Sequence, residues 1–117
     1  MTITLVAIGG VFGAIFRWLI SSLFVGGSFF YATSIVNIVG SFLLGLCYGQ
    51  YQQNPAVLAL VAIGFCGAFT TFSTFALDIL RLNQEAPIQI IVTYIMANIG
   101  GAILACWLGL RLTQLSA

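Results

Sequence analysis

The sequence predicts an all-α membrane protein with four transmembrane helices, the third of them broken near its middle. Of the 117 residues, 62% are hydrophobic and only 4% are charged, whereas a soluble domain carries roughly 25% charged residues. A chain with so few charges could not cover a folded surface in water. Since a bilayer-spanning helix takes about 20 residues, the length allows at most four or five spans.

The composition also excludes several classes of function. A net charge of +1 provides no basic surface, so no nucleic-acid partner is expected. The sequence contains no histidine and no pair of acids within one apolar run, so an enzyme is not expected. The cysteines Cys47, Cys66 and Cys106 are far apart and form no CxxC pair. They are expected to be small apolar packing residues rather than a metal or redox site.

Four apolar runs separated by short polar segments give the spans. The first run begins without a basic region or a cleavage site, so it is predicted to be a span and not a signal peptide. It ends at Gly26-Gly27-Ser28, a turn signal, and two later loops end in Pro55 and Pro87. The predicted spans are residues 3–25, 30–48, 56–82 and 88–110, in a single domain of residues 1–117.

The third run is unusual in both length and composition. At roughly 27 residues it is longer than a bilayer needs, and residues 64–75 combine two glycines with four hydroxyl side chains. Gly64 and Gly67, followed by the hydroxyl run, are the expected place for a break in this helix. Phe69, Phe72 and Phe75 recur every three residues, which predicts that they lie near one helix face. Irregular backbone at this depth must be satisfied by protein or by an ion.

Small residues recur every fourth position in the other three runs. This spacing lets membrane helices approach closely, so a compact bundle that forms an oligomer is expected. The residues concerned are Gly9 and Gly13, then Ser41, Gly45 and Gly49, then Ala97, Gly101, Ala105 and Gly109.

The arginines give the chain almost no orientation preference. With four spans the α-amino group and Arg111 share one side of the membrane, while Arg17 and Arg81 lie toward the other. Two positive groups on each side provide no bias under the positive-inside rule. The chain could then insert in both directions and pair as an antiparallel, dual-topology homodimer.

Polar side chains at helical spacing predict a path for a small anion. Thr33, Asn37 and Ser41 lie four residues apart in the second run, and Tyr94 and Asn98 do so in the fourth. The alternative is that these side chains only form hydrogen bonds between helices, but this accounts poorly for Asn37 together with the hydroxyl side chains of residues 64–75. These groups are neutral donors, and both acids of the chain are expected at the end of the third span or beyond. A cation transporter usually needs an embedded acid, so the donors favour an anion, which phenyl ring edges could also contact.

Three segments resemble the small bacterial fluoride channels of the Fluc/CrcB type. They are residues 9–17 (GGVFGAIFR), residues 37–42 (NIVGSF) and residues 64–75 (GFCGAFTTFSTF). The third segment is the most specific, and the resemblance covers nearly the whole chain. In the fourth span Asn98 and Ala102 depart from it, since other members carry hydroxyls there, and Trp18 stands where the family often has Tyr.

The resemblance implies a passive, fluoride-selective channel that exports fluoride from the cytoplasm and so lowers its toxicity. It implies an antiparallel homodimer with two pores in the bacterial cytoplasmic (inner) membrane, crossing the lipid bilayer several times. It also implies a structural sodium ion, Na+, at the dimer centre, bound by the backbone carbonyls of Gly67 and Thr70. Arg17 matches a first-span arginine with a vestibule or structural role. The implied pore residues are Asn37, Phe72 and Phe75, with Thr33, Ser73, Thr74 and Tyr94 beside them.

Two other functions compete with this interpretation. A proton-coupled exporter of the small multidrug-resistance type is equally short, but it needs a glutamate in the first span, where this chain has only Arg17. A non-transporting membrane assembly subunit is the second alternative. It would leave the hydroxyl and phenylalanine residues of the third span without a role.

Overall fold

The computed structural model describes residues 1–115, and every regular element in that range is helical. Four helical units are long and apolar enough to cross a membrane, which confirms the predicted all-α class with four candidate spans. These units extend beyond most of the expected limits. Their bounds are Thr2–Leu23, Phe29–Tyr51, Pro55–Glu85 and Ile88–Leu115.

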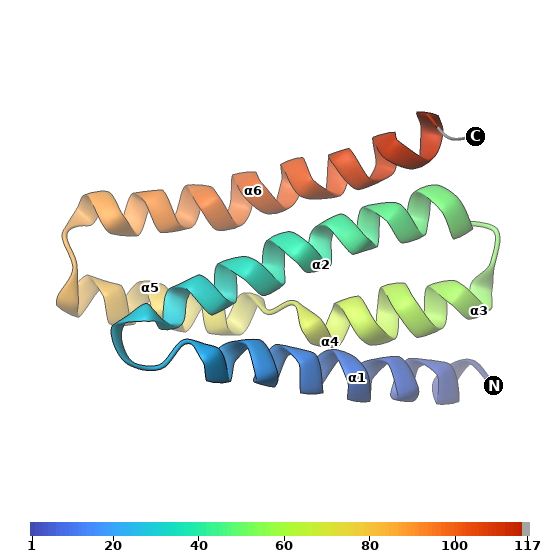
Figure 1. The fold of residues 1–117 in the computed structure, drawn as a ribbon, viewed down its shortest axis with the longest axis horizontal. Helices are drawn as coiled ribbons and strands as arrows, with labels where there is room; N and C mark the ends of the chain where they lie inside the picture. Colours follow the sequence, from blue (N-terminus) through green and yellow to red (C-terminus); the bar gives the residue numbers. More distant parts are fainter. Residues whose placement is uncertain (116–117) are drawn as a thin grey trace.

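The helices form a flat slab of 46 × 31 × 19 Å (Figure 1). The central helix α2 (Phe29–Tyr51) packs mainly along α6 (Ile88–Leu115) on one side and also contacts the third unit. On the far side of the third unit, α1 (Thr2–Leu23) completes the slab. The start of α1 and the end of α6 lie at the same end of the slab (Figure 1), as an even number of spans requires.

The third unit consists of four consecutive segments. It begins as α3 (Pro55–Val57) and continues as the π-helical stretch η2 (Leu58–Cys66). It then runs through α4 (Gly67–Phe69) and, after a break, ends as α5 (Phe72–Glu85). A π-helix of nine residues is long, because π-turns occur mostly as single bulges.

Short connections join the units. The short 3-10 helix η1 (Gly26–Ser28) links α1 to α2, and Gly26 has a φ of +80°, which glycine adopts without steric cost. Asn54 caps α3 by accepting a hydrogen bond from the Val57 N–H at 3.2 Å, with Pro55 at the first helical position. Ala86, extended before Pro87, ends α5.

Glycines bring the backbones into direct contact within the chain. A Cβ added at Gly9 would overlap the carbonyl oxygen of Leu60, and one at Gly64 would lie 2.7 Å from the Val6 carbonyl oxygen. Gly45 and Gly109 likewise press against backbone atoms where α2 meets α6. The spacing of small residues therefore serves close packing inside a single chain.

The break lies in the hydroxyl run and not at the glycines. Thr70 (φ −80°, ψ 160°) and Thr71 (φ −153°, ψ 117°) are extended, whereas Gly64 and Gly67 are both helical. The expected shared face of Phe69, Phe72 and Phe75 is therefore wrong, because the break separates the first from the other two. Phe69 is buried and stacks on Phe65, with ring centroids 5.4 Å apart.

Candidate functional site

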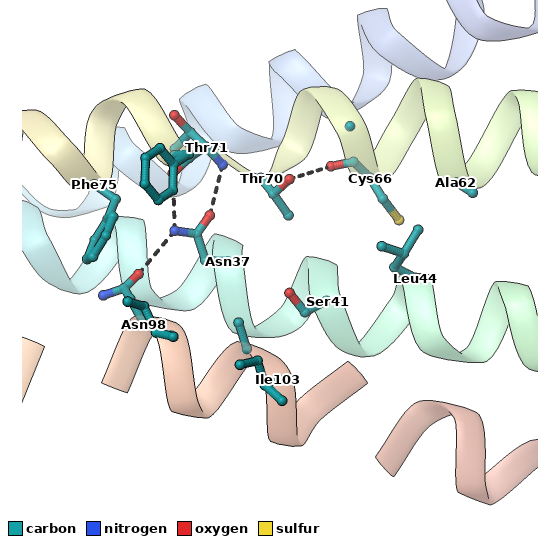
Figure 2. A pocket seen from close by; sticks show the side chains of 14 residues that line it. Asn37, Ser41, Leu44, Ala62, Cys66, Thr70, Thr71, Phe75, Asn98 and Ile103 are labelled. Atoms are coloured by element: carbon teal, nitrogen blue, oxygen red, sulfur yellow. Dashed lines mark hydrogen bonds between the residues drawn. The ribbon is translucent and has the colours of Figure 1, made fainter. Parts of the chain in front are cut away.

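Asn37, in the middle of α2, holds the break of the third unit in place (Figure 2). Its Oδ1 accepts a hydrogen bond from the Thr71 N–H at 2.8 Å, and its Nδ2 donates to the Thr71 carbonyl at 3.2 Å. One side-chain amide thus satisfies both backbone polar groups of an extended residue. Without such a partner, these groups would be costly to bury among apolar helices.

The two helix ends at the break expose different backbone groups. Thr71 caps α5, because its Oγ1 accepts a hydrogen bond from the Thr74 N–H at 3.1 Å. In a continuous helix that N–H would bond to the Thr70 carbonyl, and the Thr71 N–H would bond to the Gly67 carbonyl. Both carbonyls therefore lose their regular partners, and α4 presents its negative end where α5 presents its positive end.

Arg17 reaches the break from α1. Its Nη1 donates to the Thr70 carbonyl at 3.3 Å, which partly replaces the helical partner that this carbonyl lost. Arg17 also lines a cavity of about 290 Å³ together with Thr33, Thr71 and Thr74. The arginine is thus both a contact between α1 and the third unit and the charged group of a polar cavity.

A second cavity also reaches Thr71. It has a volume of about 370 Å³ and is lined by Asn37, Phe72, Phe75 and Asn98, with Thr70 and Thr71 at the break. Phe75 is 5% exposed, whereas Phe72 is 76% exposed in the single chain, and their ring centroids are 5.5 Å apart. Thr71 lines both cavities, so both reach the break.

Asp78 is the functional candidate that the sequence interpretation missed. It is 1% exposed, and its Oδ2 accepts hydrogen bonds from the Thr33 hydroxyl at 2.5 Å and from the Tyr94 hydroxyl at 2.9 Å. The sequence interpretation placed Asp78 at the end of the third span but did not foresee that it is buried there, in α5. The available signal was its position three residues after Phe75, which places both side chains on one face of α5.

The expected pathway residues therefore fall into two groups. Thr33, Phe75 and Tyr94 are buried inside the chain, and the Phe75 and Tyr94 rings lie 5.5 Å apart. Phe72, Ser73 and Thr74, at the start of α5, form the exposed group, and Asn37 is half-buried. Gly67, the expected sodium ligand, is also exposed.

Asn98 on α6 forms hydrogen bonds to two residues of α2 and to one residue a turn earlier in α6. Its Oδ1 accepts from the Asn37 Nδ2 at 3.0 Å, and its Nδ2 donates to the Ser34 Oγ at 2.9 Å and to the Tyr94 carbonyl at 3.1 Å. A row of hydrogen-bonded polar groups consequently runs from Ser34 through Asn98 and Asn37 to Thr71. Ser41, four residues after Asn37, lines the larger cavity farther along α2.

Comparison with known proteins assigns the chain to a family. A family described as "CrcB-like protein, Camphor Resistance (CrcB)" matches residues 4–110. The chain belongs to the CrcB-like family. A relative in Shewanella halifaxensis named "Fluoride-specific ion channel FluC" is 41% identical over 113 residues, which cover 92% of this chain and 91% of the relative.

Two further CrcB-like relatives carry similar names. A "Fluoride-specific ion channel FluC 2" of Rhodococcus jostii is 41% identical over 119 residues, covering 97% of this chain and 100% of the relative. A protein of the same name in Staphylococcus haemolyticus is 39% identical over 111 residues, covering 92% of each chain. The likeness therefore extends over the break, both cavities and all four helical units of this CrcB-like chain.

Proposed function

We propose that this CrcB-like protein is a fluoride-specific ion channel that lets fluoride leave the cytoplasm down its electrochemical gradient, which lowers fluoride toxicity. The observation that carries the proposal is the cavity where Asn37, Phe72 and Phe75 meet at the start of α5. The names of the relatives agree with it.

The chemistry of this cavity suits a small anion. An amide N–H donates to an anion, ring edges carry the positive end of the aromatic quadrupole, and α5 directs its positive dipole end toward the break. Arg17, the charged residue of the smaller cavity, would attract anions into it. None of the side chains lining the larger cavity is charged, so an ion would be held loosely enough to leave again.

The pathway would run through both cavities. An anion would enter beside Arg17 and pass Thr74 and Thr71 at the break. It would then reach Asn37 and the two phenylalanines in single file. Asp78 does not face the ion in this scheme, since it accepts the hydroxyl hydrogens of Thr33 and Tyr94 and fixes both side chains beside Phe75.

A second copy of the chain would complete the pathway. Phe72 is 76% exposed, and the larger cavity is open along Ile99 and Ile103 of α6. An antiparallel partner would cover this apolar edge and form two pores related by symmetry. Arg17 and Arg81 lie in the second halves of α1 and α5, toward the end of the slab opposite Arg111 and the amino terminus, which fits insertion in both orientations.

The backbone at the break would bind a sodium ion between the two copies. The carbonyls of Gly67 and Thr70 lack their regular helical partners, and carbonyl oxygens are ligands suited to hard cations. Two carbonyls from each copy give four oxygens. Gly67 is exposed, as a site shared between copies requires. Bound there, the ion would neutralise the negative end of α4 in each copy.

The two competing functions fit less well. A small multidrug-resistance-type exporter needs a free acid in its first span. α1 contains none, and buried Asp78 lies in α5 with two hydroxyls bonded to it. An assembly subunit without transport would have no use for an amide and two aromatic rings around one cavity.

Fluoride efflux from liposomes that contain the purified protein tests the proposal. The liposomes contain potassium fluoride, and valinomycin is added so that potassium can leave together with fluoride. A fluoride-selective electrode should then record rapid efflux. Chloride loaded at the same concentration should stay inside. Equal efflux of both ions, or none of either, would rule the function out.

Assembly and sodium need separate measurements. The detergent-solubilised protein should have the mass of a dimer, and reporters fused to the C-terminus should be found on both sides of the membrane. Replacing sodium by N-methylglucamine should weaken the dimer more than replacing chloride by nitrate. A single C-terminal orientation would exclude dual topology, and a dimer indifferent to sodium would exclude the cation site.

A further inference from the structure

Both amide hydrogens of Asn37 are already used inside the chain. An asparagine NH2 group has two donors, and those of Asn37 go to the Thr71 carbonyl at 3.2 Å and to the Asn98 Oδ1 at 3.0 Å. An anion in the larger cavity can therefore bond to Asn37 only by displacing one of these acceptors. Figure 2 shows the three residues beside Phe75.

The two acceptors are not equally replaceable. Releasing the Thr71 carbonyl would leave a backbone group of the break unsatisfied. The N–H of the same residue donates to the Asn37 Oδ1 at 2.8 Å. Releasing Asn98 disturbs less, because its Nδ2 remains anchored to Ser34 and to the Tyr94 carbonyl. Asn98 also lines the same cavity as Phe72 and Phe75, so its oxygen lies on the ion's side.

We propose that the Asn98 Oδ1 is an internal stand-in for the anion and thereby sets how tightly the pathway holds fluoride. This inference rests on the proposed function. In the empty site the neutral oxygen accepts the Asn37 N–H; an arriving anion takes that hydrogen bond, which becomes charge-assisted and stronger. When the ion moves on, the Asn98 oxygen returns.

The exchange lowers the affinity of the pathway for fluoride. Each binding event costs the Asn37–Asn98 hydrogen bond, and each release restores it. Asn98 is 4% exposed, so its displaced oxygen meets no bulk water while the ion is bound, which adds to the cost of each binding event. A conducting pathway needs this balance, because an ion held too firmly does not leave.

Removing the Asn98 oxygen should strengthen binding. Asn98→Ser is the preferred variant, because a serine in a helix can bond back to the carbonyl four residues earlier, here Tyr94, and is too short to reach Asn37. Asn98→Leu, which keeps the volume without any polar atom, is the second. Each should lower the fluoride concentration giving half-maximal efflux about five-fold, the equivalent of one neutral hydrogen bond.

The loss of any side-chain hydrogen bond in α6 could change efflux through helix packing alone, so a matched control is needed. Thr93→Ala removes a side-chain hydrogen bond of the same helix, from the Thr93 hydroxyl to the Gln89 carbonyl, without touching Asn37. It should leave the half-maximal concentration unchanged. Variants are compared only as monodisperse protein by size-exclusion chromatography.

A binding measurement separates this inference from the proposed function. Potassium fluoride, compared with potassium chloride, should raise the melting temperature of wild-type protein in detergent, and in the Asn98→Ser variant the same rise should need about five-fold less fluoride. A half-maximal concentration that is unchanged or higher in this variant overturns the inference, even where efflux is normal. Absent efflux with the expected shift in binding contradicts the channel function alone.

Discussion

The side-chain amide of Asn37 makes two hydrogen bonds to Thr71, one to its N–H and one to its carbonyl. A broken helix between apolar neighbours is tolerated only where such groups are satisfied. The residue that the fluoride pathway would use as a donor is therefore also the residue that makes the break possible.

Replacing Asn37 should accordingly affect both stability and transport. Asn37→Leu leaves two backbone groups of Thr71 unpaired, and we expect it to lower the free energy of unfolding by about 2–5 kcal/mol. Fluoride efflux should be lost as well. Chemical denaturation in detergent measures the first effect and the liposome assay the second. Thr93→Ala, on α6 outside both cavities, removes only a local hydrogen bond to the Gln89 carbonyl and is the control; it should change neither by much. An Asn37→Leu protein as stable as wild type would contradict the bridging role.

Phe75 is expected to act through its ring and not through its volume. Phe75→Ile keeps a large apolar group beside Tyr94, so it should cost less than about 2 kcal/mol of stability but suppress fluoride efflux at least ten-fold. Phe69→Ile changes a buried phenylalanine on the other side of the break and should leave the efflux near the wild-type rate. Normal efflux from Phe75→Ile protein would remove the ring edge from the mechanism.

Asp78 should be needed for the order of the buried half of the site. Its carboxyl accepts from Thr33 and Tyr94, and a hydrogen bond to a charged group contributes about 1.5–3 kcal/mol. Asp78→Leu leaves both hydroxyls buried without that acceptor and should destabilise the protein by roughly twice this amount. A double-mutant cycle with Tyr94→Phe measured by thermal unfolding should give a coupling energy above about 1 kcal/mol. Additive effects would show that the contact contributes nothing.

Two adjacent glycines provide a matched test of the packing between α1 and the third unit. A Cβ at Gly9 would overlap the Leu60 carbonyl, while the nearest atom to a Cβ at Gly10 is 4.0 Å away. Gly9→Ala should therefore clearly lower the melting temperature, because overpacking a core costs about 1–3 kcal/mol of stability. Gly10→Ala should be close to neutral or slightly stabilising, because alanine favours the helix. Equal effects of the two substitutions would contradict the close approach.

The sequence by itself determined the class of the protein and named many of the residues that line the two cavities at the break. Extreme apolarity with scarcely any charge leaves a four-span membrane bundle as the solution, since only helices and closed barrels satisfy their backbone in lipid. The sequence predicted a break in the region of Gly64, Gly67 and the following hydroxyl run, and the hydroxyl run is the part where the backbone leaves the helix.

The tertiary structure decided the parts that depend on contacts between distant residues. Sequence spacing put Phe69 on one face with Phe72 and Phe75, but the extended Thr70 and Thr71 end that periodicity. Asp78 was expected at the end of the third span, but its burial could not be read from the sequence, because the hydroxyls that bond to it come from α2 and α6. The pairing of Asn37 with Asn98, separated by 61 positions, likewise follows from helix packing that local periodicity does not contain.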